Sequence, residues 1–265
     1  MPRILIVGAT RGLGAALVYR YAKHDWSVYA TARSSKPDTA SFPPQTKWLK
    51  EVDCAKSDVG DTIARHAYLN PFDQSVNDPL DVAVITAGVF TTEDFNKRDE
   101  GGPNFDDEMR MYATSAVAPV LIVHALVHNG LLKTGSKVVL VSSEAGSVAL
   151  RIEAEGNYGH HASKAALNMV GKLLSLELQD KGIVVSIVHP GFMRTQMTHG
   201  VGFDKFWDSG HAVTPDEAAV SLKEWTDELD MSKSGQFWAP RGPADIGTAE
   251  NVLGKNLSTP LQLPW

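Results

Sequence analysis

The chain has 265 residues, of which 43% are hydrophobic and 21% charged, and this is the composition of a globular protein long enough to bury a substantial core. Its net charge of −6 argues against nucleic acid and against an anionic membrane surface as partners. Cys54 is the only cysteine, which excludes an internal disulfide, favours a reducing compartment and predicts a buried thiol with no redox role.

The N-terminal apolar run is too short to be a targeting segment. It covers residues 4–7 and leads directly into a glycine-rich loop, so it reads as a first strand. No continuous apolar run approaches the length that is needed to cross a membrane. We therefore expect a cytoplasmic protein.

Short apolar runs alternate with helical patterns along the whole chain. The expected strands are residues 3–7, 27–32, 47–52, 81–86, 137–142, 184–189 and 235–240. The expected helices are residues 12–24, 57–69, 106–129, 158–181 and 214–229. Strands that are apolar on both faces and alternate with helices predict an α/β protein with a doubly wound, mostly parallel sheet of about seven strands and helices on both faces. We expect a single Rossmann domain over residues 1–265, with its ligand crevice at the carboxyl ends of the strands.

Three glycines lie between the first strand and the first helix, at Gly8, Gly12 and Gly14. Glycines at this point allow a sharp turn and let the backbone approach a pyrophosphate, which then lies at the N-terminus of the helix. Their spacing is Gly-x-x-x-Gly-x-Gly and departs from the dinucleotide fingerprint Gly-x-Gly-x-x-Gly. The loop predicts an NAD(P)-binding site, although any tight strand-to-helix turn also uses glycine.

Two arginines lie at the expected adenosine end of this site. Arg33 follows the second strand, at the point where an NAD-binding enzyme usually carries an acidic residue for the ribose hydroxyls. Arg11, inside the glycine loop, adds a second cation. Since a guanidinium suits a 2′-phosphate, the pattern favours NADP(H) over NAD(H). The alternative is that both arginines are solvated surface residues.

The loop 195–213 is the candidate substrate lid. Its apolar side chains could cover an apolar or aromatic ligand, and they are Met197, Phe203, Phe206 and Trp207. Packing against the sheet or a partner subunit explains them equally well. The histidines at 24, 66, 124, 128, 189, 199 and 211 show no spacing that suggests a metal site.

Five motifs occur in order at the expected strand ends. They are Gly8-Ala9-Thr10-Arg11-Gly12-Leu13-Gly14, Asp53, Thr86-Ala87-Gly88, "SSEAGS" at 142–147 and "HPGFMRT" at 189–195. Together they resemble the short-chain dehydrogenase/reductase (SDR) family over nearly the whole chain, and within it the C-factor-like branch of small carbonyl reductases. The resemblance implies these cofactor-binding residues: Gly8, Thr10, Arg11, Gly12, Leu13, Gly14, Arg33, Asp53, Ala87, Gly88, Lys164, Pro190, Gly191, Met193 and Thr195.

The same resemblance implies a catalytic set with two departures. Ser143 matches the serine that binds the substrate oxygen, and Lys164 matches the lysine that holds the nicotinamide ribose and lowers the pKa of a catalytic tyrosine. His160 stands at the position of that tyrosine, four residues before the lysine. Ser115 stands where the family has an asparagine that anchors a proton-relay water. The nearest tyrosine, Tyr158, comes two residues too early.

Three explanations of the missing tyrosine remain open. His160 shares a helix face with Lys164, whose charge lowers the pKa of the imidazole. The neutral ring could act as a base, whereas as an acid for ketone reduction it would need recharging through solvent. Tyr158 could act only if the helix begins later or a bulge resets its register. Otherwise His160 fills the space of the tyrosine and redox activity is lost. His161 faces elsewhere on the helix.

The motifs predict an NADP(H)-dependent oxidoreductase, of the carbonyl reductase or alcohol dehydrogenase type, that acts on a small carbonyl or alcohol substrate. The alternative is a non-redox protein of the same fold: an isomerase, a dehydratase or an NADP(H)-sensing binding protein. The apolar helix 109–127 is expected in the core but leaves a homodimer open. We expect neither a metal nor a nucleic-acid or membrane partner.

Overall fold

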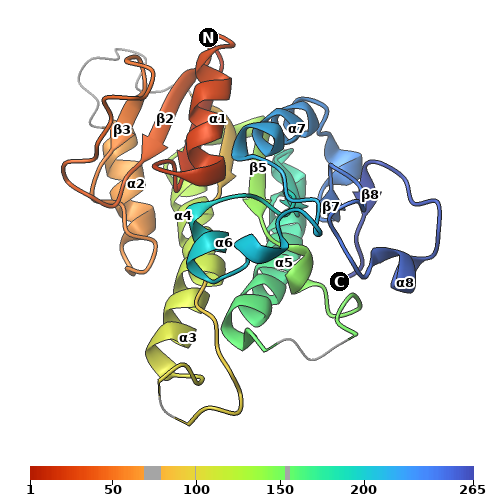
Figure 1. Cartoon of the computed structure of the whole chain (residues 1–265). Coiled ribbons are helices and arrows are strands. Elements are labelled where there is room, and N and C mark those ends of the chain that lie inside the picture. The colour runs from red at the N-terminus through yellow and green to blue at the C-terminus, as the bar shows by residue number, and fades with distance from the viewer. Residues whose placement is uncertain (69–78, 99, 153–155) are drawn as a thin grey trace.

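The computed structural model describes residues 1–68, 79–98, 100–152 and 156–265, built around one sheet of eight strands (Figure 1). The strand order is β3-β2-β1-β4-β5-β6-β7-β8, in which β7 and β8 pair antiparallel and the other neighbours pair parallel. The strands are β1 (Arg3–Val7), β2 (Ser27–Thr31), β3 (Lys47–Leu49), β4 (Leu80–Ile85), β5 (Leu132–Val141), β6 (Val184–Val188), β7 (Phe237–Ala239) and β8 (Leu261–Gln262). The predicted doubly wound, mostly parallel sheet is confirmed.

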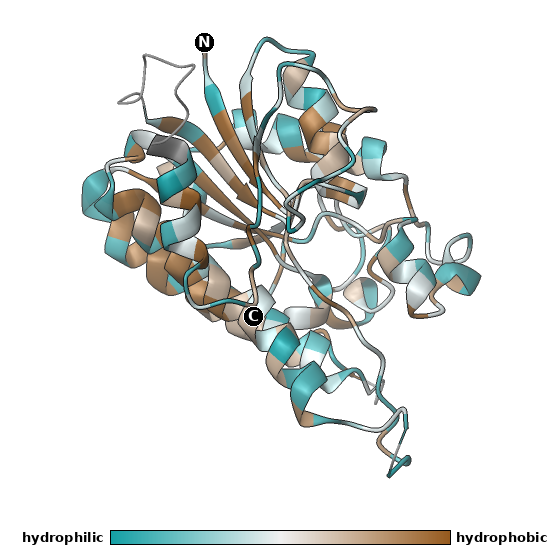
Figure 2. Ribbon diagram, turned by 90° about the vertical axis from the view of Figure 1, so that its left-hand side faces the viewer, coloured by the Kyte–Doolittle hydropathy of each residue, from teal (hydrophilic) through white to brown (hydrophobic). Residues whose placement is uncertain are grey.

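Helices cover both faces of this sheet. They are α1 (Gly12–Ala22), α2 (Val59–Tyr68), α3 (Phe105–Tyr112), α4 (Ala118–His128), α5 (Tyr158–Leu178), α6 (Gln196–Gly200), α7 (Pro215–Asp227) and α8 (Ala249–Leu253). Buried residues of α1 and α7 form one core cluster with the sheet, whereas those of α2, α4 and α5 belong to a second. Figure 2 shows the brown, apolar strands enclosed between these helical layers.

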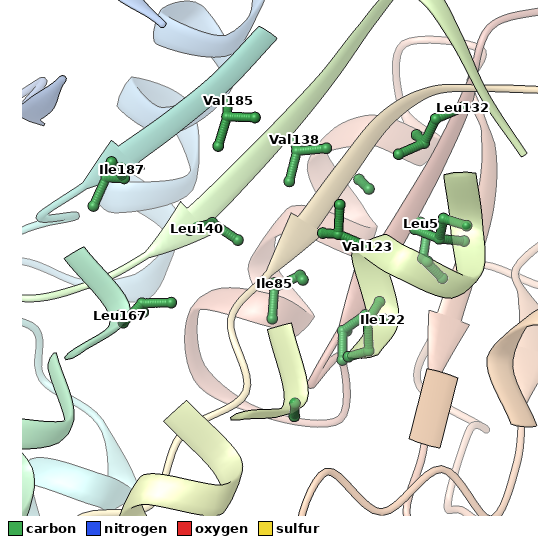
Figure 3. Packing of buried hydrophobic residues seen from close by; sticks show 14 of the residues in the cluster. Leu5, Ile85, Ile122, Val123, Leu132, Val138, Leu140, Leu167, Val185 and Ile187 are labelled. Atoms are coloured by element: carbon green, nitrogen blue, oxygen red, sulfur yellow. The ribbon is translucent and has the colours of Figure 1, made fainter. Parts of the chain in front are cut away.

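Alternation along the strands assigns side chains to the two cores, because successive residues of a strand point to opposite faces. In β1, Ile4 and Ile6 pack with α1 and α7. Leu5 packs with the other helices, and Figure 3 shows it on the same side of the sheet as Ile122 and Val123 of α4. The apolar runs that predicted the strands are therefore apolar because both faces are covered.

The single helix that the sequence predicts over residues 106–129 is wrong in one respect. The structure has α3, then a π-helical segment at Ala113–Val117, then α4. Pro119 lies in the first turn of α4 and cannot donate a backbone hydrogen bond to a preceding turn. The π-helical segment lies directly before α4 and accommodates the change in hydrogen bonding. This segment contains Ser115.

Other boundaries differ where local geometry intervenes. Strand β3 ends at Leu49 and not at residue 52, because Glu51 adopts a left-handed φ of 58°. The loop predicted over residues 195–213 contains the short helix α6, and its N-cap Thr195 forms a capping box with Thr198. The sequence also missed α8 and β8, which are too short to show a periodic pattern. Residue 69, the predicted end of the second helix, lies outside the described residues.

The helical run Phe105–His128 is long and apolar enough to cross a membrane by length and composition alone. In the fold, 56% of the most apolar 18 residues of this run are buried, and Ile122 and Leu126 have no exposed surface. Burial of this kind is typical of a core helix.

Candidate active site

The turn between β1 and α1 is a tight backbone crossing. Gly8 has a φ of +86°, and a Cβ atom there would lie 2.9 Å from both Thr86 Oγ1 and Ala87 N. A Cβ atom on Gly14 would lie 2.2 Å from the Gly8 carbonyl oxygen. Thr86 Oγ1 also donates to the Val7 carbonyl at 2.8 Å, which ties the end of β4 to the end of β1. The N-terminus of α1 thereby opens directly onto the carboxyl edge of the sheet.

The predicted adenosine end lies at the ends of β2 and β3. Arg33 follows buried Thr31 and Ala32 and is exposed, as is Arg11 before α1. Among the described residues, neither arginine forms an ion pair or side-chain hydrogen bond. Asp53 is half-buried, and its Oδ1 accepts a hydrogen bond from the Ala55 amide at 3.0 Å.

Further residues of the predicted cofactor site lie in the segment after β6, next to the turn between β1 and α1. Gly191 has a φ of +111° after buried Pro190, and Met193 forms a parallel bridge with Val213. A Cβ atom on Gly12 would lie 3.6 Å from Thr195 Cγ2, so the segment after β6 reaches back to the glycine loop. The structure therefore brings both segments to one edge of the sheet. Thr10 is exposed there, whereas Leu13 is buried in the core of α1 and α7.

The turn that carries Ser143 is clamped onto α5. Ser143 Oγ accepts a hydrogen bond from the Ala145 amide at 3.2 Å. Buried Ser142 donates to Asn168 Oδ1 at 2.6 Å, and Asn168 Nδ2 donates to the Gly146 carbonyl at 3.1 Å. A Cβ atom on Gly146 would lie 2.6 Å from the carbonyl carbon of Lys164. Backbone contact therefore holds Ser143 beside the helix that carries Lys164.

Lys164 is buried at the centre of this arrangement. Its Nζ donates to the Val141 carbonyl at 2.9 Å and lies 3.8 Å from the position of a Cβ atom on Gly88. Burial lowers the pKa of Lys164 from 10.5 to about 8. Its ammonium is therefore a weak acid that can release a proton near neutral pH.

His160 lies one turn before Lys164, as predicted, but an aromatic ring covers it. Phe90, from the segment after β4, stacks on the imidazole with 4.0 Å between ring centroids. Burial, followed by the charges of Lys164 and His161, lowers the pKa of His160 to about 3. Its Nδ1 is buried and makes no hydrogen bond to the described residues. The ring is therefore neutral throughout the physiological range.

Tyr158 is the first residue of α5, and 47% of its surface is exposed. Its ring lies 5.9 Å from that of exposed Phe95. Because α5 is continuous from Tyr158 through Lys164, the two residues lie about 120° apart around the helix. Ser115 is buried in the π-helical segment, and its Oγ makes no hydrogen bond to the described residues.

The candidate lid, residues 195–213, packs against Phe90, the ring that stacks on His160. Phe203 packs edge-on against Phe90 at 5.5 Å and contacts Phe206 at 6.1 Å. Trp207 donates from its indole nitrogen to Thr198 Oγ1 at 3.2 Å, inside the same segment. Met197 is half-buried. In this conformation the aromatic residues of the segment pack on the protein itself.

A pair of carboxyl groups caps the N-terminus of α5. Glu93 Oε1 accepts a hydrogen bond from the Gly159 amide at 3.0 Å, and Glu93 is 8% exposed. Burial raises the pKa of Glu108 to about 7, with further contributions from a hydrogen bond and the charge of Glu93. Glu108 is therefore only partly ionised at neutral pH, and both carboxyl groups lie at Gly159, the residue before His160.

Sequence reasoning missed Phe90, Glu93 and Glu108. Phe90 lies two residues beyond Gly88, and its position after a strand end was the one available signal. The two glutamates are 15 residues apart in an irregular segment and in α3, and only the tertiary fold brings both to Gly159.

Comparisons with known proteins show the family of the chain. The family model described as short chain dehydrogenase matches residues 2–205. An uncharacterized oxidoreductase of Schizosaccharomyces pombe is 30% identical over 250 residues, which cover 88% of this chain and 93% of the relative. The 1-hydroxy-2-glutathionyl-2-methyl-3-butene dehydrogenase of Rhodococcus sp. strain AD45 is 27% identical and covers 89% of this chain and 96% of its own.

Solved structures show the same fold. The carbonyl reductase Sniffer of Drosophila melanogaster matches all of both chains with a TM-score of 0.74 at 21% identity. An NADPH-bound carbonyl reductase from chicken fatty liver also has a TM-score of 0.74 at 21% identity, and the match covers all of this chain and 94% of that one.

Removing the aromatic cover should raise the pKa of His160. In Phe90→Ala, water reaches the imidazole, and since burial is the largest cause of the low pKa, we expect a rise of about one unit or more from the value near 3. An NMR titration of the histidine ring signals measures it. Phe95→Ala, which removes a ring from Tyr158 and not from His160, should leave the pKa unchanged, and equal shifts in both variants would contradict the assignment.

The raised pKa of Glu108 should make the stability of the protein depend on pH. The pKa of Glu108 is raised above its ordinary value of 4.5, so the folded state holds the proton of Glu108 more tightly and loses relative stability as pH rises from about 4.5 to about 7. Glu108→Gln should remove this loss and raise the melting temperature at pH 8 by about 1–2 °C, a small effect because solvent screens the partly buried pair.

The control for this measurement is Asp106→Asn, which removes the same charge from an exposed position two residues away. Thermal unfolding at pH 5 and pH 8 compares the two variants. An Asp106→Asn variant that gains as much stability at pH 8 would show that net charge, and not the carboxyl pair, is responsible.

Proposed function

The chain belongs to the short-chain dehydrogenase family, and on this premise we propose that it is an NADP(H)-dependent oxidoreductase of the carbonyl reductase type. The observation that carries the proposal is the convergence of the Ser143 turn, buried Lys164 and the glycine loop at one edge of the sheet. The fold of NADPH-bound and other carbonyl reductases supports the same class of reaction.

The residues around the glycine loop fit a dinucleotide. The Gly8 carbonyl leaves no room for a Cβ atom on Gly14, and this close packing of α1 on β1 brings the N-terminal amides of α1 to the sheet edge, where a pyrophosphate would bind. Gly8, Gly12, Thr10 and Leu13 would surround it. Arg33 and Arg11, which have no protein partner among the described residues, would bind the 2′-phosphate, and Asp53 would lie at the adenine.

The other end of the cofactor would be held by the remaining predicted residues. Ala87 and Gly88 would lie beneath the nicotinamide ribose, with Lys164 beside it. Pro190 and Gly191, followed by Met193 and Thr195, would hold the nicotinamide amide. A bound NADPH supplies the hydride that reduces a carbonyl carbon.

Ser143 would donate a hydrogen bond to the substrate oxygen and stabilise the negative charge that develops there. We propose that the proton comes from Lys164, since its ammonium is the acid whose pKa, about 8, suits the task. His160, which is neutral and covered by Phe90, would shape the pocket, and Tyr158 would stay at the surface. After reduction to the alcohol, the neutral amine of Lys164 regains a proton from solvent.

A non-redox function remains the second candidate, because the position of the family's tyrosine holds a covered, neutral imidazole. In that case the pocket would bind NADP(H) as a sensor, or Ser143 would polarise a carbonyl for an isomerase or dehydratase.

Turnover distinguishes the two candidates. We expect NADPH oxidation, followed by its absorbance, with at least one member of a panel of ketones, aldehydes and quinones. Lys164→Ala should lower kcat by about 10²–10⁴-fold and Ser143→Ala by about 10²-fold. Lys172→Ala, on the same helix, should have no effect. Because the acid form of Lys164 is lost above its pKa, reductive kcat should fall as pH rises through about 8.

His160→Tyr restores the family's acid and should raise reductase activity. NADPH binding without turnover by the wild-type protein would instead support the sensor. Turnover that persists in Lys164→Ala would exclude the lysine as proton donor.

The cofactor preference is tested at Arg33. Arg33→Ala should raise the Kd for NADPH by about tenfold or more and leave the Kd for NADH nearly unchanged, because only NADPH carries the 2′-phosphate. Calorimetry measures both. Arg20→Ala, at the opposite end of α1, is the control, and equal weakening of the two cofactors in Arg33→Ala would exclude the phosphate contact.

We also propose that the protein forms a homodimer through α4 and α5. Val120 of α4 is exposed, as are three apolar residues spaced four and three apart on α5: Met169, Leu173 and Leu176. Leu173→Asp should halve the mass in size-exclusion chromatography with light scattering, whereas Met231→Asp, at an exposed site elsewhere, should not. A wild-type monomer would refute the dimer.

We also propose a cytoplasmic location, because Cys54 is the only cysteine and a protein without an internal disulfide suits a reducing compartment. Burial, with a contribution from the Asp53 charge, raises the pKa of this thiol to about 12. The thiol is therefore unreactive, as expected for a cysteine with no redox role.

A further inference from the structure

A buried histidine–aspartate pair lies behind the proposed catalytic serine. His189 directly follows β6, and Asp245 comes from the segment between β7 and α8. His189 Nε2 lies 3.2 Å from Asp245 Oδ2, and their side chains are only 6% and 4% exposed. The sequence motif "HPGFMRT" includes His189, but neither residue has a role in the site described above.

The second ring nitrogen determines the tautomer of His189. Its Nδ1 accepts a hydrogen bond from the Glu144 amide at 3.0 Å. A backbone N–H can only donate, so Nδ1 carries no proton and Nε2 carries the hydrogen. The ring therefore donates from Nε2 to Asp245.

Asp245 completes the connection. Its Oδ2 also accepts a hydrogen bond from the Phe192 amide. Burial opposes ionisation of Asp245, but the hydrogen bonds from His189 and from the Phe192 amide outweigh it and hold the pKa of Asp245 below its ordinary value. The aspartate is thus an anionic acceptor for two donors. The continuous chain of hydrogen bonds runs from Glu144 through His189 and Asp245 to Phe192.

These hydrogen bonds join the two segments whose relative position the proposed reaction depends on. Glu144 is the residue after Ser143, and Phe192 is the residue after the Pro190–Gly191 turn. The Ser143 turn is held on α5 through Ser142 and Asn168, and His189 holds it from the side of β6. Loss of the Glu144 bond would free the backbone of Ser143 on that side.

We propose that His189, oriented by Asp245, is a positioning residue that fixes Ser143 relative to the Pro190–Gly191 turn and so sets the rate of the chemical step. The inference rests on the proposed function, in which Ser143 binds the substrate oxygen while the turn holds the nicotinamide. A misplacement of about 1 Å in such an arrangement costs about 10²-fold in rate.

Two polar substitutions test the hydrogen bonds of the two ring nitrogens separately. In His189→Asn the side-chain oxygen takes the place of Nδ1 and can accept from Glu144. In His189→Gln the longer amide reaches the place of Nε2 and can donate to Asp245 but leaves the Glu144 amide without an acceptor. Both variants remove the ring, so loss of packing affects them alike.

We expect His189→Asn to keep kcat within about threefold of the wild type and His189→Gln to lose about tenfold or more, with KM for the carbonyl and Kd for NADPH nearly unchanged in both. Asp245→Asn, whose single amide oxygen can accept both bonds, should resemble the wild type, whereas Asp245→Ala should lower kcat.

Equal kcat losses in His189→Asn and His189→Gln, a larger loss in His189→Asn, or no loss in either would overturn the positioning role while leaving the proposed function intact. Wild-type protein that binds NADPH but reduces no carbonyl would instead defeat the proposed function itself, and calorimetry with NADPH identifies that case.

Discussion

The site depends on one backbone contact at the carboxyl edge of the sheet, where Gly8 and Gly14 cross beside Thr86. A single Cβ atom on Gly14 would overlap the Gly8 carbonyl oxygen. Because the contact is main chain on main chain, α1 can begin immediately above the end of β1, with its free N-terminal amides at the crevice between β1 and β4. Thr86 fixes the neighbouring strand to the same point. Each later motif reaches the site because its strand ends at this edge.

Burial of ionisable side chains is the second feature on which the site depends. Its effect on the pKa differs with the chemistry of each side chain. Burial favours the neutral form of both His160 and Lys164, but it leaves the imidazole unable to carry a proton near neutral pH and turns the ammonium into a usable acid. Asp245 is also buried, yet two donors keep it ionised. The hydrogen-bond partners of a buried group therefore decide whether burial removes its charge, shifts its pKa toward neutrality or is outweighed.

Much of the architecture can be predicted from the sequence for a physical reason. The alternation of apolar strands and helices along the chain is local information, and parallel strands buried on both faces have few other arrangements. Gly8 and Gly14 are recognisable because they lie between a strand and a helix, whereas Ser143 and Lys164 are recognisable through the resemblance to the family. The helical period also places His160 and Lys164 on one face of α5, which the structure bears out.

Local patterns could not indicate what covers or connects these residues. Phe90 stacks on His160 from a different segment, Glu93 and Glu108 meet at Gly159, and Asp245 reaches His189 across 56 positions of sequence. Such contacts depend on how elements distant in the chain pack together, and the pKa of each group follows from that packing. The sequence by itself determined the fold and the candidate reactive groups, whereas the tertiary structure alone decided which of these groups are covered, solvated or ionised, because protonation depends on solvent access and on neighbours that sequence spacing does not reveal.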